Sequence, residues 1–239
     1  MSFDSVEEFD SYFNSPIRPE SLNRINNKTD DFLHLMFEMK KKIEVGEIEM
    51  VQRPIHALLL QVVIIKFSTK KGIKYKLDQL FDCFINQMGK FMERELAICY
   101  LYLKNDKRTE KFFGKVQKNS KDILQVIEGM SWDLAHIRHL EDSMRHSVYD
   151  EASFEIHSLA TYDNGLKDML SVYPVESLSF RKNSLNVIFT YEFEKFIEEI
   201  DFSNYWDRRK PEKRLLIYKK TDFSYLIKEK QRELLNIIK

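Results

Sequence analysis

Residues 121–146 read KDILQVIEGMSWDLAHIRHLEDSMRH, and apolar side chains recur in them at every third or fourth position. This spacing is typical of an amphipathic helix. Val126, Met130 and Ile137 fall on one face, which we expect to pack against a core. Ser120 stands just before the stretch as a candidate N-cap. We therefore predict one long helix here.

The composition predicts that the chain before residue 121 is also mainly helical. Glycine and proline number 6 and 5, whereas average usage of roughly 12% predicts about 29 in 239 residues. The shortage argues against a turn-rich all-β fold and against a glycine-rich phosphate loop. The helices that we expect before residue 121 span residues 4–14, 19–44, 54–67, 77–88 and 92–103, with a short one at Phe112-Phe113.

The pattern changes after residue 150. Alternating side chains predict a strand over 154–161, and Asn164-Gly165 marks a turn before a short helix. The further elements that we expect are strands over 175–180 and 186–190 and helices over 191–200 and 222–238. The predicted fold class is α+β or α/β, mostly helical, with a helical N-terminal half and a small sheet in the C-terminal half. We expect a helical region 1–120, an α/β region 121–204 and a basic C-terminal helix in 205–239, in one compact body.

The cysteines and the chain start indicate a cytoplasmic protein. Cys83 and Cys99 form no CxxC pair, so a reduced chain without a zinc knuckle is expected. The first ten residues are acidic and lack the order of a signal peptide. The most apolar run, 57–65, is nine residues long, well short of the roughly 20 that span a bilayer. We expect it to be a core helix, without a membrane partner.

Charge is zero in sum but uneven along the chain. Residues 51–121 carry 15 basic and 6 acidic groups, net +9, and residues 205–239 carry 11 and 5, net +6. Residues 1–50 carry net −5 and residues 122–204 net −10. An acidic block between basic ones can hold a metal ion flanked by phosphate-binding surface. The alternative is that solvated helix faces differ by chance.

Asp133 interrupts the apolar face of the predicted helix, between Met130 and Ile137. A carboxylate in that row needs a hydrogen bond, an ion pair, a metal or a cavity, because burying it bare is costly. Glu141 lies two turns further along the same side, and Arg138 is placed to pair with it. The alternative for both acids is purely structural: a backbone hydrogen bond for Asp133, and an ion pair for Glu141.

Asp163 closes the expected strand Leu159-Ala160-Thr161-Tyr162-Asp163. Ligands gather at the carboxyl ends of strands in open α/β sheets, where an aspartate can bind a hard cation. The alternative is that Asp163 caps the helix that follows the Asn164-Gly165 turn.

Histidines on the long helix offer another metal-binding pattern. His139, Asp142 and His146 share a face, and His136 is three residues from His139. This spacing can bind a transition metal such as zinc. A solvated polar face among arginines is the alternative.

Two of these features resemble the second half of a PIN-like nuclease domain. Asp133-Leu134-Ala135-His136-Ile137 resembles the family's helix that opens with an aspartate, and Thr161-Tyr162-Asp163 resembles its Thr-x-Asp signature. Glu141 stands where some members carry an additional acid. The resemblance covers residues 121–180, and the aspartate of the family's first strand has no counterpart in residues 1–50.

The resemblance implies metal-assisted phosphodiester hydrolysis. Asp133, Asp163 and Glu141 would be the catalytic, metal-binding acids, with Mg²⁺ or Mn²⁺ as the cofactor. Basic side chains of 66–121 and 205–239 would bind RNA, and Tyr100, Tyr102 or Trp206 would stack bases. The expected protein is a metal-dependent ribonuclease, of the toxin or defence-effector kind. The alternative is a non-catalytic helical module, a degenerate PIN-like domain that binds a protein partner. The sequence predicts no oligomeric state.

Overall fold

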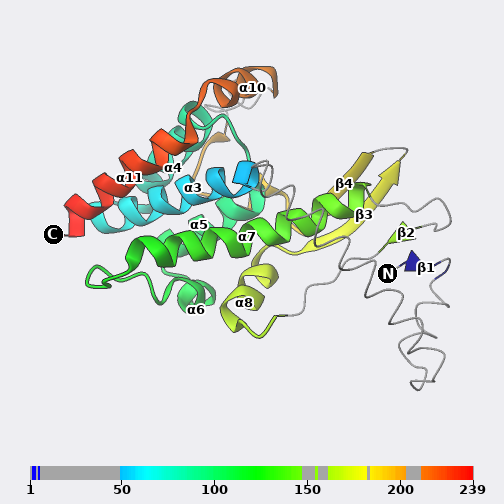
Figure 1. Ribbon diagram of the computed structural model, residues 1–239, viewed down its shortest axis with the longest axis horizontal. Coiled ribbons are helices and arrows are strands. Elements are labelled where there is room, and N and C mark those ends of the chain that lie inside the picture. Colours follow the sequence, from blue (N-terminus) through cyan, green and yellow to red (C-terminus); the bar gives the residue numbers. More distant parts are fainter. Residues whose placement is uncertain are drawn as a thin grey trace. The chain divides into compact units, whose positions relative to one another are not determined.

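The computed structural model describes residues 2–3, 5, 49–146, 154–155, 161–181, 184–202 and 211–238. The contacts divide the chain into two units, each described here by itself. One comprises Met1–Met50 and Arg138–Leu159, and the other comprises Val51–Ile137 and Ala160–Lys239. The described part is mostly helical with small antiparallel sheets, which confirms the coarse fold class (Figure 1).

In the first unit, β1 (Ser2–Phe3) pairs antiparallel with β2 (Phe154–Glu155). This unit also takes the last turns of α7 (Ile123–His146), whose helix was predicted from residue 121. The helices expected over 4–14 and 19–44 lie outside the described residues, as do residues 156–160 of the expected strand.

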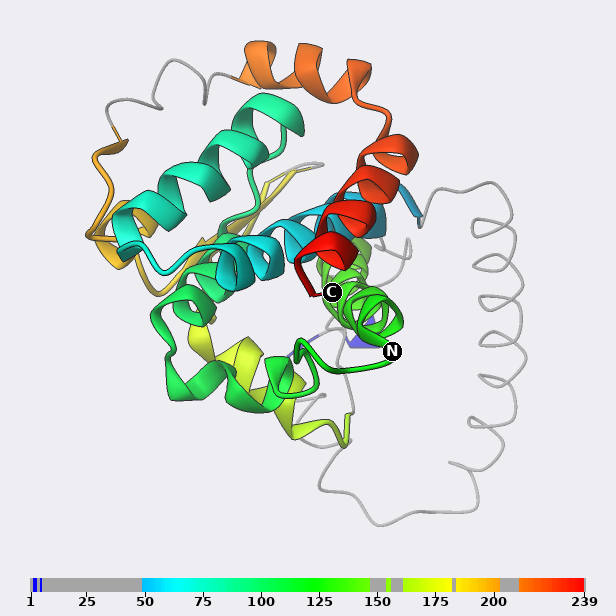
Figure 2. The same cartoon turned by 90° about the vertical axis from the view of Figure 1, so that its left-hand side faces the viewer.

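The core of the second unit is α3 (Glu49–Ser68), which is apolar on nearly all sides. Gln52 Nε2 donates to Ser131 Oγ of α7 at 2.6 Å. Lys230 Nζ of α11 (Phe223–Ile238) donates to Gln61 Oε1. Helices therefore pack on several faces of α3 (Figure 2), which explains why its sequence is a continuous apolar run rather than a stripe.

By length and composition alone, α3 is a candidate membrane span, but 67% of its most apolar window is buried inside the protein. That burial fits the core helix expected from the sequence. The helix also begins earlier than expected, at Glu49, so Pro54 lies inside it rather than in the first turn. Proline has no N–H to donate, so one hydrogen bond of the helix is missing there.

The helices expected over 77–88 and 92–103 are confirmed in outline. α4 (Ile73–Asp82) runs into a π-helical turn, η1 (Cys83–Gln87), and α5 (Glu93–Lys104) ends at Asn105 in the left-handed region, φ 58°. A 3₁₀ turn, η2 (Lys107–Thr109), and α6 (Glu110–Phe113) follow, as the sequence indicated.

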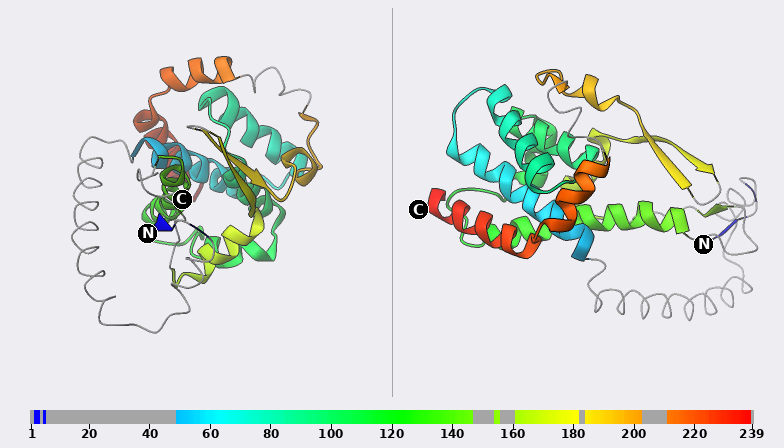
Figure 3. Two further views of the ribbon diagram at one scale, coloured as in Figure 1. Left: turned by 90° about the vertical axis from the view of Figure 1, so that its right-hand side faces the viewer. Right: turned by 90° about the horizontal axis from the view of Figure 1, so that it is seen from above.

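The last part of the second unit contains a β-hairpin. After α8 (Asn164–Val172), β3 (Val175–Arg181) pairs antiparallel with β4 (Ser184–Phe189), close to the two predicted strands (Figure 3). The helix expected over 191–200 is limited to α9 (Phe193–Phe196), and α10 (Pro211–Lys220) was not predicted.

The expected PIN-like arrangement is not supported. The described strands form two separate two-stranded antiparallel sheets, and residues 161–163 are irregular rather than the end of a strand. Only two residues separate β3 from β4, and a connection that short permits a hairpin but no parallel crossover.

Candidate functional site

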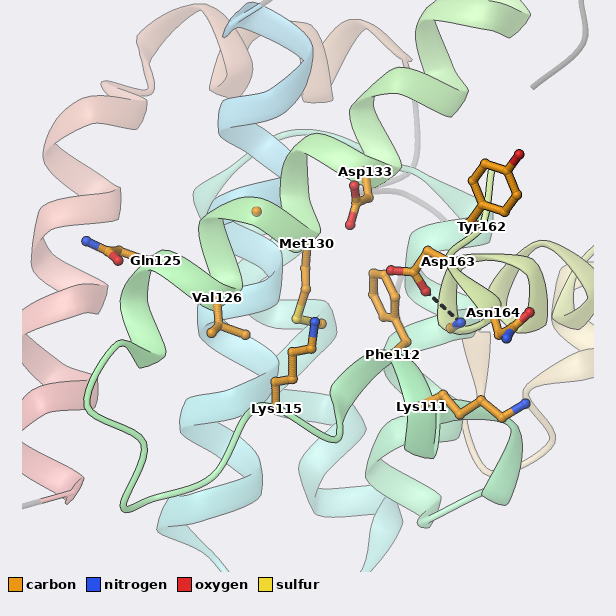
Figure 4. A pocket seen from close by; sticks show the side chains of 12 residues that line it. Lys111, Phe112, Lys115, Gln125, Val126, Met130, Asp133, Tyr162, Asp163 and Asn164 are labelled. Atoms are coloured by element: carbon orange, nitrogen blue, oxygen red, sulfur yellow. Dashed lines mark hydrogen bonds between the residues drawn. The ribbon is translucent and has the colours of Figure 1, made fainter. Parts of the chain in front are cut away.

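Two of the predicted site residues, Asp133 and Asp163, line the same pocket, which has a volume of about 550 Å³ (Figure 4). Its walls come from α6 and the segment after it, from α7, and from the start of α8. The lining residues are Lys111, Phe112, Lys115, Gln125, Val126, Gly129, Met130, Asp133, Tyr162, Asp163, Asn164 and Gly165.

Asp133 reaches the pocket from α7, one turn beyond Met130. Its side chain is half-buried and points into the pocket in Figure 4. Burial raises the pKa of this carboxyl above its usual value, and the nearby charge of Asp163 raises it further. The two carboxylates are thus close enough to repel each other, although 30 residues separate them in the sequence.

Asp163 also caps α8. Its Oδ1 accepts hydrogen bonds from Gly165 N at 2.7 Å and from Leu166 N at 3.0 Å, and its own N donates to Thr161 Oγ1 at 3.1 Å. The capping alternative is therefore confirmed. Capping occupies Oδ1, and the exposed carboxylate still lines the pocket that Asp133 enters.

Gly165 sets the position of this cap against α6. A Cβ on Gly165 would lie 3.1 Å from both the Lys111 carbonyl carbon and the Phe112 Cα. A side chain at this position would require α8 or α6 to shift by a few tenths of an ångström. The Asn164-Gly165 pair, which the sequence marked as a turn, is thus the first turn of α8 and fixes where Asp163 stands.

Two lysines of the pocket have different surroundings. His136 and, to a smaller extent, Lys115 partly offset the raised pKa of Asp133. Lys111 instead runs away from Asp133 in Figure 4, and its Nζ pairs with Asp168 Oδ2 at 2.9 Å. Of the two pocket lysines, Lys115 is therefore the one whose charge acts on Asp133.

Glu141, the third predicted acid, is buried and lies 3.2 Å from Arg138 Nη1 through its Oε2. This is the ion pair named as its structural alternative. Glu141 is not among the residues that line the pocket described above.

Within the described ranges, no three His, Cys, Asp or Glu side chains gather in a metal-binding group. The side chains of Asp142 and His146, from the histidine pattern, lie outside the described part.

Two pocket residues to which the sequence analysis gave no individual role are Lys115 and Tyr162. Tyr162 is fully exposed at the pocket rim, next to Asp163 (Figure 4). The tyrosines that were expected to stack bases, Tyr100 and Tyr102, are buried, and Tyr100 Oη donates to Glu199 Oε2 at 2.7 Å. Trp206 lies outside the described residues. In the sequence, Tyr162 directly precedes the candidate site residue Asp163, and this was the one feature that could have marked it as a pocket residue.

The chemistry of the two acids is of the kind that could hold Mg²⁺ or Mn²⁺ with few protein ligands. Magnesium keeps several waters and is commonly held by one or two carboxylates together with substrate phosphate. Asp133 and Asp163 would supply such a pair, and a divalent cation between them would relieve their repulsion. Lys115 adds a positive charge suited to a phosphate oxygen.

Comparison of the chain with protein-family models, curated proteins and solved structures gave no match.

Proposed function

We propose that this protein is a metal-dependent hydrolase of RNA phosphodiester bonds, with its site in the pocket of Asp133 and Asp163. The observation that carries the proposal is the convergence of these two carboxylates, from separate elements, beside Lys115. Carboxylate pairs flanked by a lysine suit a substrate that brings negative charge together with a divalent cation. The proposal rests on this pocket alone and needs no PIN-like fold.

The side chains divide the work as follows. Asp133 and Asp163 would hold the cation, and the hydrogen bonds from Gly165 N and Leu166 N keep the Asp163 carboxylate in one orientation. Lys115 would neutralise a phosphate that enters the pocket. A bound Mg²⁺ or Mn²⁺ lowers the pKa of a water and stabilises charge on the phosphate. The exposed ring of Tyr162 offers a face on which an unpaired base stacks.

The test is cleavage of single-stranded RNA in the presence of Mn²⁺, with variants that change charge but not shape. Asp163→Asn keeps an oxygen that caps α8, because asparagine is as good an N-cap as aspartate. Asp133→Asn keeps the volume of its side chain. Asp122→Asn is the matched control, because Asp122 is exposed in the same unit and does not line the pocket.

We expect each site variant to lose at least about 100-fold in cleavage rate, and the control to keep wild-type activity. Asp163→Ala should lose the same activity and, in addition, about 1 kcal/mol of stability with the cap. Cleavage by the Asp133→Asn variant at the wild-type rate would remove the acid pair from the mechanism.

A non-catalytic interaction module is the second candidate, and exposed leucines favour it. On α10, Leu215 is 50% and Leu216 is 62% exposed, more than most large apolar side chains of the described part. On this reading the wild type cleaves no RNA. Replacing both leucines by Gln would then abolish binding of a protein partner, measured by co-purification with that partner, whereas Asp133→Asn would leave that binding unchanged.

A further inference from the structure

Two lysine-rich segments without acidic residues lie in the second unit. Residues 50–77 contain arginine and lysine but no aspartate or glutamate, and the lysines from 66 to 76 fall in and around the connection between α3 and α4. Residues 111–121 contain four lysines, again without an acid, in α6 and the connection to α7. Lys70, Lys71 and Lys74 of the first segment and Lys115, Lys118 and Lys121 of the second are exposed.

The fold joins these two segments, although about 40 residues separate them. Lys118 Nζ donates to Phe67 O at 3.2 Å and lies 5.5 Å from the centre of the Phe67 ring. Lys66 lines a pocket of about 340 Å³ together with Gly114 and Val116. The acids that line it are Asp106, which pairs with Arg108 at 2.8 Å, and Glu110. The two segments are therefore in contact, and the name lysine surface is used for their lysines: Lys66, Lys70, Lys71, Lys74, Lys76, Lys111, Lys115, Lys118 and Lys121.

The lowered pKa of Lys66 shows that its charged form is disfavoured within the lysine surface. Burial, with a smaller contribution from the charge of Lys76, lowers the pKa of Lys66 to about 8. Like charges held together in this way gain from a polyanion that neutralises several of them at once. The surface also continues into the acid-pair pocket, because Lys111 and Lys115 of the second segment line that pocket.

The side chains of the lysine surface favour nucleic acid over a membrane. A membrane-binding face combines lysines with exposed apolar side chains that enter the lipid. Within residues 66–78 and 110–122, which the structure describes throughout, Tyr75 is the one exposed large hydrophobic side chain, at 39%. A lone exposed ring among lysines suits stacking with a base instead.

We propose that the lysine surface binds the phosphate backbone of single-stranded RNA and leads it to the acid-pair pocket. The identity of RNA as the cleaved substrate rests on the proposed function, whereas backbone binding by these lysines does not. Phosphates contacted by Lys70, Lys71 and Lys118 would release counterions, so that the affinity falls steeply with salt.

The experiment measures binding by fluorescence anisotropy with a labelled single-stranded RNA of about 16 nucleotides. EDTA is present, so that no metal-dependent cleavage occurs. The first variant is Lys70→Gln/Lys71→Gln/Lys74→Gln, and the second is Lys118→Gln/Lys121→Gln. The matched control is Lys213→Gln/Lys219→Gln/Lys220→Gln on α10, whose three lysines are also exposed. None of these residues lines the acid-pair pocket.

We expect the triple variant of the lysine surface to bind at least about tenfold more weakly at low salt. The slope of log affinity against log salt should fall by about 2, since each single-strand phosphate contributes about 0.7. The second variant should lose less, and combining the two should lose more than either. The α10 control should bind as the wild type does, so that this inference departs from the expectation that basic side chains of 205–239 also bind RNA.

Unchanged affinity and slope in both surface variants would overturn the proposal, as would an equal loss in the α10 control. Binding to vesicles that contain anionic lipid, without binding to the RNA, would also overturn it and assign the surface to a membrane. RNA binding through these lysines without any Mn²⁺-dependent cleavage would contradict the proposed function and leave this inference intact.

Discussion

At the scale of single residues, Asp163 shows how one side chain serves structure and site together. Its Oδ1 satisfies two backbone N–H groups at the start of α8, which any N-cap aspartate does. Its position beside Asp133 comes from packing of α8 on α6, which Gly165 permits. The cap was predictable from the Asp-Asn-Gly order. Its place in one pocket with Asp133 and Lys115 was not, because no local pattern links these residues.

Asp133 is expected to reduce stability at neutral pH. Because its pKa in the folded protein lies above the usual 3.8, the folded state binds this proton more tightly than the unfolded state does. Its contribution to stability therefore falls as pH rises from about 3.8 through the raised value. Asp133→Asn should be more stable than wild type by roughly 0.5–2 kcal/mol at neutral pH. Urea denaturation at neutral pH and below pH 3.8 checks this, and a gain of equal size at both would contradict it.

His56 gives the opposite pH dependence. It is buried in α3, its Nε2 has no hydrogen-bond partner among the described residues, and burial lowers its pKa to about 4. The unfolded chain takes up this proton below about 6.5 and the folded chain does not. Stability is therefore complete above 6.5 and is lost as the pH falls toward 4, by on the order of 3 kcal/mol.

The variant His56→Leu removes this titration. Its free energy of unfolding, measured in urea across the same pH range, should fall less steeply than that of the wild type between about pH 6.5 and 4. Identical slopes for the two proteins would show that His56 is not held neutral in the fold.

At the scale of elements, Gly89 sets how α10 meets η1. Its φ is +62°, and a Cβ there would meet the backbone of Arg214 and Tyr218 in α10. Gly89→Ala should therefore cost at least about 2 kcal/mol, from the left-handed backbone and the clash together. Gly129→Ala is the control, because a Cβ on this helical glycine meets nothing within 4 Å. The control should gain about 0.5–1 kcal/mol of stability. Thermal unfolding distinguishes the expected loss in Gly89→Ala from the expected gain in Gly129→Ala. A Gly89→Ala variant as stable as wild type would contradict the close packing of Gly89 against α10.

The elements themselves divide into those that local pattern specifies and those that it does not. α5 and α7 followed from apolar periodicity, and a last helix was expected where α11 lies. Strands were expected near β3 and β4, but their pairing as an antiparallel hairpin was not. α10 was missed because its exposed leucines follow no stripe. The irregular stretch before Asp163 was read as a strand, since alternation over a few residues is shared by strands and extended loops.

At the scale of the whole molecule, sequence predicted a helical protein with a small sheet and an acid pair, but not their arrangement. The buried α3 and its partners agree with the expected core. The pairing of strands depends on contacts between distant segments, and these reduced the expected α/β half to antiparallel pairs. Asp133 and Asp163 nonetheless line one pocket of the second unit, and metal binding by them stays a prediction.

The central claim is that Asp133 and Asp163 together bind one divalent cation. Titration of Mn²⁺ into the full chain, with free Mn²⁺ measured by electron paramagnetic resonance, tests it without reference to activity. We predict one site in the wild type and in Asp122→Asn, with affinity at least about tenfold weaker in Asp133→Asn and in Asp163→Asn. Equal Mn²⁺ affinity in all four proteins would contradict the account.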